Sequence, residues 1–184
     1  PIPSRGLGDV YKRQIKAWEG LRIMSKEACR PFCKNRDGMV QGEGAAIFIF
    51  ENYKDAKKRG ANILAEVAGF SMTSDAIDIV NPSKKGAARA MIGALKDAKF
   101  NPEDVEYINA HGTGTLANDK TECAAIKEVF KNHTKELMIS STKSMHGHLI
   151  GGTGAVELLA CLLALKNNVI CLLYTSPSPR DGIG

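Results

Sequence analysis

Short apolar runs and helical periods follow one another along the chain. Ala45–Phe50, the run AAIFIF, is apolar and rich in β-forming residues after the turn-like Gly42-Glu43-Gly44, which predicts a buried strand. Asn62–Phe70 predicts a second strand by its alternation and β-branching. Between the two, Asn52–Arg59 predicts a short charged helix that ends at Gly60.

The next part of the chain has the pattern of a loop, a helix and a strand. Ser71–Ser83 combines Ser, Thr and Asp with an Asn-Pro pair, which predicts a loop. Gly86–Lys99 predicts a helix, because its apolar residues lie at helical spacing and Asn101-Pro102 follows as a stop. Those apolar residues are Ala90, Met91, Ala94, Leu95 and Ala98. Val105–Ala110 then predicts a short strand.

Helix and strand alternate again in the rest of the chain. We expect Asn118 or Asp119 to cap a helix whose buried side is Ala124, Ala125, Ile126, Val129 and Phe130. Leu137–Ser140 predicts another strand, and the last helix is expected from Thr153 to about Lys166. Strands that alternate with helices favour an α/β fold with layers.

The last predicted helix is apolar on every face. Between Ala155 and Leu165, Glu157 is the one charged residue, so we expect a central, buried helix. The stretch is too short to cross a bilayer. A carboxylate in such a setting needs a partner or a raised pKa.

Both ends of the chain are richer in Gly, Pro and Ser than the rest. Read back into DNA, the codons GAT GTG TAT AAG AGA CAG encode Asp9–Gln14, and the complementary strand, TGT CTC TTA TAC ACA TCT, encodes Cys171–Ser176. This one element, in two orientations, resembles the transposase adaptor used to prepare sequencing libraries, and its continuation accounts for Ser4–Gly8 and Pro177–Asp181. We therefore expect residues 1–14 and 171–184 to be adaptor-derived tails around one folded unit, 15–170.

Composition narrows the class of protein. A chain of 184 residues with 43% hydrophobic residues can bury one core. The formal net charge of +5 falls to +3 without the tails, and the charges are scattered, so neither a nucleic-acid interface nor a defined basic patch for an acidic carrier protein is indicated. Five cysteines without a regular framework, and no convincing signal peptide, favour a reduced, cytoplasmic location and no membrane association.

Two loops after predicted strands are the candidates for chemistry. They are Asn109–Thr115 (NAHGTGT) and Ser140–His148 (SSTKSMHGH), and glycines permit close approach in both. The residues alone leave equally open that these are two tight turns whose histidines satisfy local hydrogen bonds. A zinc site of His146 and His148 with His111 or a cysteine is a weaker alternative, because the spacing is not that of a common finger. The chain has no complete phosphate-binding or dinucleotide-binding loop.

The two loops resemble motifs of the β-ketoacyl-acyl-carrier-protein synthases. Asn109–Thr115 resembles the first histidine motif of this family and Ser141–His148 its lysine-histidine motif. Arg30-Pro31-Phe32 followed by Asn35–Ala45 resembles a third stretch. The resemblance covers Ile15–Ile170 in the family's order and is closest to the elongating type II enzymes. It implies a thiolase-like layered α-β-α fold, of which this internal fragment holds mostly the C-terminal half.

The resemblance also implies an activity for the full-length parent. It is a decarboxylating Claisen condensation of an acyl-enzyme with malonyl-acyl-carrier protein, which gives 3-oxoacyl-acyl-carrier protein in fatty acid elongation. His111 and His148 match the two histidines that donate hydrogen bonds to the malonyl thioester oxygen. Lys143, which matches a lysine that pairs with a glutamate at Glu157, would disfavour imidazolium, as would burial. Thr113 and Thr115 resemble the threonines that hold the phosphopantetheine arm of acyl carrier protein.

The same resemblance sets the expected partners and the departures from the family. Acyl carrier protein and a second copy of the parent are the expected partners, with no metal and no cofactor bound by the chain itself. His146 replaces a small or hydroxyl residue, so we expect it to be only a neighbour of the site. The acyl nucleophile belongs upstream of Ile15, and the cysteines that do not match it are Cys29, Cys33, Cys123 and Cys161.

Three alternatives remain at this point. A polyketide or nodulation-type ketosynthase would use the same chemistry. A non-catalytic ketosynthase-like partner subunit would lack the nucleophile. The fragment as written is expected to be inactive and to fold poorly, because it would expose apolar surface.

Overall fold

The computed structural model describes residues 15–78 and 80–171, and the predicted tails 1–14 and 171–184 lie outside these residues except for Cys171. A helical stretch at residues 15–20 opens the described chain. The elements that follow are α2 (Tyr53–Lys58), α3 (Lys84–Ala98), η1 (Pro102–Asp104), β1 (Tyr107–Asn109), α4 (Leu116–Phe130), η2 (Lys131–Lys135), β2 (Met138–Ser140), α5 (Lys143–His146), η3 (Ile150–Gly152) and α6 (Thr153–Asn167).

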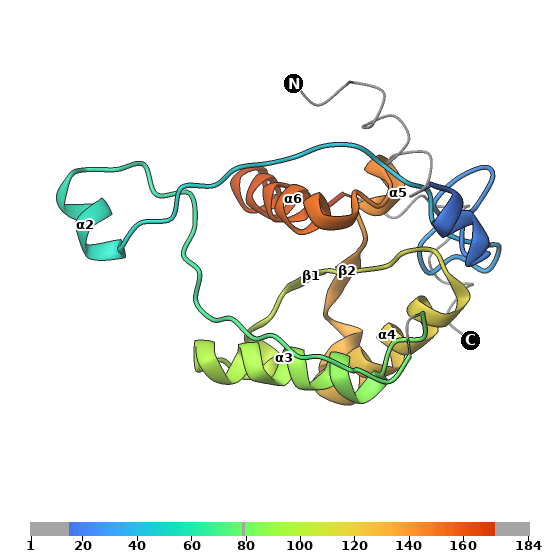
Figure 1. Ribbon diagram of the computed structural model, residues 1–184. Coiled ribbons are helices and arrows are strands. Elements are labelled where there is room, and N and C mark those ends of the chain that lie inside the picture. The colour runs from blue at the N-terminus through green and yellow to red at the C-terminus, as the bar shows by residue number, and fades with distance from the viewer. Residues whose placement is uncertain (1–14, 79, 172–184) are drawn as a thin grey trace, which may run out of the picture.

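A parallel pair of strands lies at the centre of the described chain. β1 and β2 are joined by the crossover helix α4, as a parallel connection requires, and Ile108 pairs with Ile139 while Asn109 pairs with Ser140. Helices α3 and α4 lie on one side of the two strands and α6 on the other (Figure 1). The layered α/β arrangement that the sequence predicts is confirmed.

The core lies between α3, α4 and the strands. Its buried members are Ala88, Ala125, Ile126, Val129, Phe130 and Leu137, against which Ile108 and Ile139 of the strands pack. The predicted buried side of α4 is confirmed, with Ala124 only half-buried. Helix α3 begins two residues earlier than predicted, because the Ser83 side chain caps it by accepting from the Gly86 N–H.

The predictions of strands at 45–50 and 62–70 are wrong. Both segments are extended but belong to no sheet among the described residues. They form an arm that runs past α6 to α2 and returns to α3 (Figure 1), and Ile47 and Ile49 are 94% and 89% exposed. A strand needs a neighbour for its backbone hydrogen bonds, and β1 and β2 pair only with each other here. The predicted short helix between the segments is confirmed as α2.

The prediction that α6 is buried on all faces is also wrong. Thr153 is its one buried residue, while Leu159, Leu163 and Leu165 are 42%, 50% and 65% exposed. With η3, the helical segment Ile150–Asn167 reaches 18 residues at a mean hydropathy of 1.3, which meets the length and composition of a membrane span among the described residues. Core helices of soluble proteins meet the same criteria, and Glu157 makes the polar contact described below.

Candidate functional site

The two candidate loops start side by side at the carboxyl ends of the paired strands. The Ala110 N–H donates to the Ser140 carbonyl over 2.7 Å, one residue beyond the last pair of the ladder, Asn109 and Ser140. Loops at the carboxyl ends of parallel strands are the usual place for ligands in α/β folds. The structure thus brings together two motifs that are 30 residues apart in the chain.

The first loop packs against the second at a glycine. Gly112 has φ +41°, and a Cβ there would lie 2.5 Å from the Cβ of Ser141. The Ser141 hydroxyl instead donates to the Gly112 carbonyl over 2.8 Å. A larger residue at 112 would separate the two loops, so glycine is required here.

The second loop is hydrogen-bonded to the third motif, which is Arg30-Pro31-Phe32 with Asn35–Ala45. The His148 N–H donates to the Val40 carbonyl over 2.7 Å, and the Gly42 N–H donates to the His148 carbonyl over 3.1 Å. Gly147 has φ +71°, and a Cβ there would lie 2.8 Å from the Val40 oxygen. The backbone of His148 is therefore fixed on both sides by residues 40–42.

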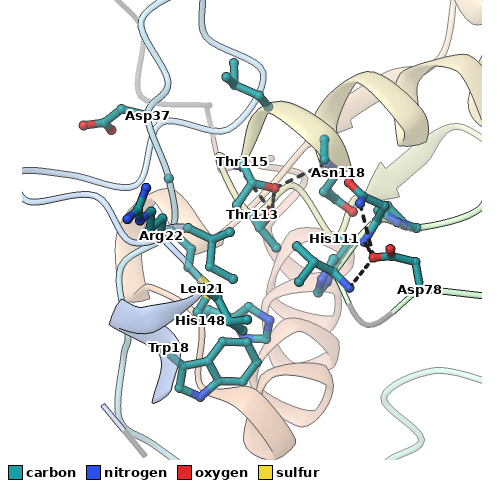
Figure 2. A pocket seen from close by; sticks show the side chains of 18 of the residues that line it. Trp18, Leu21, Arg22, Asp37, Asp78, His111, Thr113, Thr115, Asn118 and His148 are labelled. Atoms are coloured by element: carbon teal, nitrogen blue, oxygen red, sulfur yellow. Dashed lines mark hydrogen bonds between the residues drawn. The ribbon is translucent and has the colours of Figure 1, made fainter. Parts of the chain in front are cut away.

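The side chains of His111 and His148 meet at one cavity. Their rings contact edge to face, with centroids 5.2 Å apart and planes at 88°. Both line a cavity of about 530 Å³ together with Thr113 and Thr115, as Figure 2 shows. The ring that meets His111 therefore belongs to His148 and not to His146.

Hydrogen bonds set the tautomer of His148. Its Nδ1 accepts the Ile150 N–H over 3.0 Å and lies 3.0 Å from the Thr153 hydroxyl. A backbone N–H can only donate, so the neutral ring carries its proton on Nε2. In the described part of the chain, the His111 ring makes no hydrogen bond, which leaves its nitrogens available at the cavity.

Both rings are neutral at physiological pH. Burial lowers the pKa of His111 to about 4, and the charge of Lys143 acts in the same direction. Burial also lowers the pKa of His148 to about 4, with smaller contributions from His111, Lys143 and His146. Although His111 as a residue is exposed, its ring packs edge to face against His148 and lines the cavity. The predicted disfavouring of imidazolium is confirmed for both residues.

A buried ion pair lies behind the histidines. Lys143 is fully buried and its Nζ donates to Oε1 of Glu157 on α6. Burial raises the pKa of Glu157, and the hydrogen bond from Lys143 opposes this shift. The predicted partner of Glu157 is therefore confirmed, and the pair joins α5 to α6.

Thr113 and Thr115 lie in the turn between β1 and α4. Their hydroxyls are 2.8 Å apart, and both residues line the cavity. Thr115 also caps α4, because its hydroxyl accepts the Asn118 N–H over 3.3 Å. The prediction of Asn118 or Asp119 as the cap is wrong: the chain turns helical right after the glycine-rich loop, so both residues lie in the first turn.

His146 is turned into the second loop. Its Nδ1 donates to the Gly147 carbonyl over 2.7 Å and its Nε2 lies 3.0 Å from the Thr142 hydroxyl. It does not line the cavity that His111 and His148 share. Among residues 15–78 and 80–171, no group of three or more His, Cys, Asp or Glu side chains has the arrangement to hold a metal ion.

Comparison with known proteins identifies the family. Residues 64–174 match the model of the β-ketoacyl synthase C-terminal domain. The chain belongs to the β-ketoacyl synthase family. Nodulation protein E of Rhizobium leguminosarum bv. trifolii is 49% identical over 168 residues, which are 90% of this chain and 42% of that protein. The 3-oxoacyl-[acyl-carrier-protein] synthase 2 of Staphylococcus aureus is 48% identical over 154 residues, 83% of this chain and 38% of that protein.

Solved ketosynthases share the fold. A ketosynthase from a type II PKS, in complex with its acyl-carrier protein and bound to the hexaketide, matches with a TM-score of 0.83 at 36% identity. The match covers 90% of this chain and 43% of that one. The predicted thiolase-like fold is confirmed, and the chain spans about two fifths of the length of the β-ketoacyl synthases it matches.

Glu122 is a site residue that the sequence analysis did not predict. Its carboxylate accepts the N–H of His111 over 2.7 Å and that of Gly112 over 2.8 Å. Consecutive N–H groups in a glycine-rich turn need acceptors, and an acidic residue in the following helix is a suitable one. That combination was the available signal in the sequence.

Asp119 is a second carboxylate that the sequence analysis placed only as a cap. It is 1% exposed and accepts the Phe32 N–H over 2.7 Å and the Gly114 N–H over 3.2 Å. Arg36 lies 3.6 Å from it. Burial raises the pKa of Asp119, and these donors and Asn118 oppose the shift. Asp119 thus joins the third motif to the first loop.

Cys29, Cys123 and Cys161 do not have the features of an activated nucleophile. The Cys29 thiol is buried and donates to the Thr113 carbonyl over 3.3 Å, and burial raises its pKa. Burial also raises the pKa of Cys123 and of Cys161. A raised pKa keeps a thiol protonated, whereas the thiolate is the nucleophile.

Proposed function

We propose that this chain is part of a longer condensing enzyme. It would join an acyl group, held on an enzyme cysteine, to malonyl-acyl-carrier protein with loss of carbon dioxide. The enolate that remains after decarboxylation attacks the acyl thioester, the bond to the cysteine sulfur breaks, and 3-oxoacyl-carrier protein and the cysteine thiolate are formed. The relatives are more than twice as long as the matched region, and the cysteine is expected in their additional part.

The paired histidines carry this proposal. Decarboxylation places negative charge on the malonyl thioester oxygen, and fixed hydrogen-bond donors aimed at that oxygen stabilise the transition state. His148 offers Nε2–H as such a donor, because its Nδ1 is occupied by the Ile150 N–H. The His111 ring, 5.2 Å away between centroids, supplies the second donor. With pKa values of about 4, both rings stay neutral over the physiological range.

Lys143 affects the two histidines through its charge and through its bond to Glu157. It is fully buried, so the malonyl group does not reach its Nζ directly. Its charge helps to hold the pKa of both histidines low, while its bond to Glu157 fixes α5 against α6. We propose that Lys143 and Glu157 order the site and that the histidines contact substrate.

The substrate is proposed to arrive on the phosphopantetheine arm of acyl carrier protein, with no cofactor bound by this chain. The hydroxyls of Thr113 and Thr115 line the cavity that His111 and His148 share, where they can hold the polar arm. The solved type II PKS ketosynthase was captured with its acyl-carrier protein, which supports this class of partner. A homodimer of the parent and a cytoplasmic location complete the proposal.

Fatty acid elongation is the pathway we propose first. The 48% identity with a 3-oxoacyl-[acyl-carrier-protein] synthase 2 supports it. The alternative is a polyketide or nodulation-type ketosynthase, which the 49% identity with nodulation protein E favours. The chemistry at the two histidines is the same in both cases, and the acyl group that is extended differs. A non-catalytic partner subunit would differ at the nucleophile, which sequencing the uninterrupted gene would reveal.

The experiment is a decarboxylation assay on the full-length protein recovered from its uninterrupted gene. His148→Ala removes one donor, so we expect kcat for malonyl-acyl-carrier-protein decarboxylation to fall about 10²- to 10³-fold, and His111→Ala to cause a comparable loss. The decarboxylation rate is measured by the release of labelled carbon dioxide. His133→Ala is the control, because that ring bonds the Val105 carbonyl away from the cavity. Wild-type rates in both site variants would refute the assignment, and mass spectrometry of the extended products distinguishes the two pathways.

A further inference from the structure

His146 makes two hydrogen bonds that the sequence did not predict. The ring is half-buried and each of its nitrogens has a partner. Nδ1 must donate to the Gly147 carbonyl, because a carbonyl only accepts. With its proton on Nδ1, the neutral ring can only accept at Nε2, and the Thr142 hydroxyl is the donor there.

The hydrogen bonds of His146 extend to the other loop of the site. The hydroxyl of Thr142 has one hydrogen, which it gives to His146, and its oxygen accepts from Nδ2 of Asn109 over 3.2 Å. In return, the Thr142 N–H donates to Oδ1 of Asn109 over 3.3 Å. These residues thus form one series of hydrogen bonds in which each donates to the next: Asn109 to Thr142, Thr142 to His146, and His146 to Gly147.

The two ends of this series are the attachment points of the site histidines. Asn109 is the last residue of β1 and lies two residues before His111. Gly147 immediately precedes His148, and its peptide is confined by the close approach of Val40. The hydrogen bonds of Asn109, Thr142 and His146 therefore connect the end of β1, before His111, to the peptide that precedes His148.

We propose that His146 is a positioning residue for the decarboxylation step. Its two hydrogen bonds fix Gly147 and the Thr142 hydroxyl, and through Thr142 the second loop is tied to Asn109, so that the donors of His111 and His148 converge on one oxygen. This inference rests on the proposed function. It differs from a merely structural role, because only the step that needs both donors depends on their mutual geometry, and misplacement by about 1 Å can cost up to about 10²-fold in rate.

Two substitutions in the full-length protein test the idea. His146→Ala removes both hydrogen bonds, whereas His146→Asn keeps an N–H close to the position of Nδ1 and can still donate to the Gly147 carbonyl. Met145→Ala is the matched control, because Met145 is the preceding residue of the same short helix and is 69% exposed. Two half-reactions are measured for each protein: decarboxylation of malonyl-acyl-carrier protein and transfer of an acyl group to the enzyme.

We expect His146→Ala to lower kcat for decarboxylation about 10-fold with KM within about twofold of the wild type. Acyl transfer should be unchanged, His146→Asn should recover most of the loss, and Met145→Ala should behave as the wild type. If the wild type decarboxylates malonyl-acyl-carrier protein and His146→Ala does so equally fast, the inference is overturned and the proposed function stands. An equal loss in both half-reactions without recovery in His146→Asn also overturns it, as a structural effect. A wild type with its nucleophile intact that does not decarboxylate overturns the proposed function.

Discussion

At the scale of single residues, the same side chain takes different roles according to its hydrogen-bond partners. His148 and His146 are separated by one glycine, yet the first carries its proton on Nε2 and the second on Nδ1. The backbone N–H of Ile150 sets the first tautomer, and the carbonyl of Gly147 sets the second. Only the first leaves a donor pointed at the cavity that His111 shares.

The lowered pKa values of His111 and His148 predict a pH dependence of stability. Both are about 4 in the folded protein, against about 6.5 for histidine in an unfolded chain, so between these values the unfolded state binds more protons. The free energy of unfolding of the full-length protein should therefore fall as the pH is lowered from about 6.5 to about 4. Above about pH 6.5 these two histidines do not contribute to the pH dependence of the free energy of unfolding.

Urea unfolding at several pH values measures this dependence. The variant His111→Asn/His148→Asn lacks both titrating rings, so its loss of stability over the same pH window should be smaller than that of the wild type. His133→Asn serves as the control outside the cavity. Equal slopes in the wild type and the double variant would show that these rings are not responsible.

At the scale of elements, carboxylates connect the helices to the loops of the site. Glu157 joins α6 to Lys143 on α5. Glu122 joins α4 to the His111 loop, and Asp119 joins α4 to the loop around Phe32. The helices therefore fix the loops by charge-assisted hydrogen bonds as well as by packing.

The Lys143–Glu157 pair predicts strong non-additivity. Lys143→Met leaves the Glu157 carboxylate without its buried partner, and Glu157→Leu leaves a fully buried ammonium. Each single change should cost about 3 kcal/mol of unfolding free energy, and the double variant should cost less than the sum of the two. The exposed pair Lys84–Glu128, at 48% exposure on both sides, is the control, and Lys84→Met should cost at most about 1 kcal/mol. Additive losses in the double variant would contradict a coupled pair.

Glu122 predicts an effect on the His111 loop from the neighbouring helix. Glu122→Gln keeps one acceptor oxygen and loses the other, so either His111 or Gly112 loses its backbone acceptor. We expect a loss of about 1–3 kcal/mol in unfolding free energy, with a decrease in decarboxylation rate. Glu128→Gln makes the same change on an exposed position of α4. Equal behaviour of the two variants in denaturation and activity would rule out this role of Glu122.

At the scale of the whole molecule, the site lies on a core that leaves large apolar surfaces exposed among the described residues. The site lies at the ends of β1 and β2, above the core of α3 and α4. The arm at residues 45–72 and the outer side of α6 present large apolar side chains to solvent. Examples are Ile47, Ile49, Met72 and Leu165. The match to about two fifths of the relatives' length is consistent with further chain covering these surfaces.

This exposure predicts that residues 15–170 will not form a stable unit when produced alone. Large contiguous apolar surfaces favour association over a unique folded state. We expect a broad, non-cooperative thermal transition and strong binding of a hydrophobic dye. The full-length parent is the control, for which we expect a cooperative transition and little dye binding. A sharp, reversible melt of 15–170 without dye binding would contradict this expectation.

The sequence by itself determined the features that depend on short stretches of chain. Helical spacing and the residues that end a helix placed α2, α3, α4 and α6 with small errors at their ends, and glycine-rich loops after β1 and β2 indicated the site. The apolar setting of Glu157 indicated its need for a partner. The resemblance supplied the family and selected His148 over His146, a choice that the ring contact with His111 supports.

The tertiary structure decided what depends on neighbours distant in the chain. Apolar runs such as 45–50 become strands only beside another strand, and the described residues contain none for them. Burial of α6 likewise needs a covering layer, which its composition cannot provide. The tautomer of His148, the carboxylate of Glu122 on the His111 loop and the contact of His146 with Thr142 follow from hydrogen bonds of fixed direction. Those bonds exist only once the loops are folded.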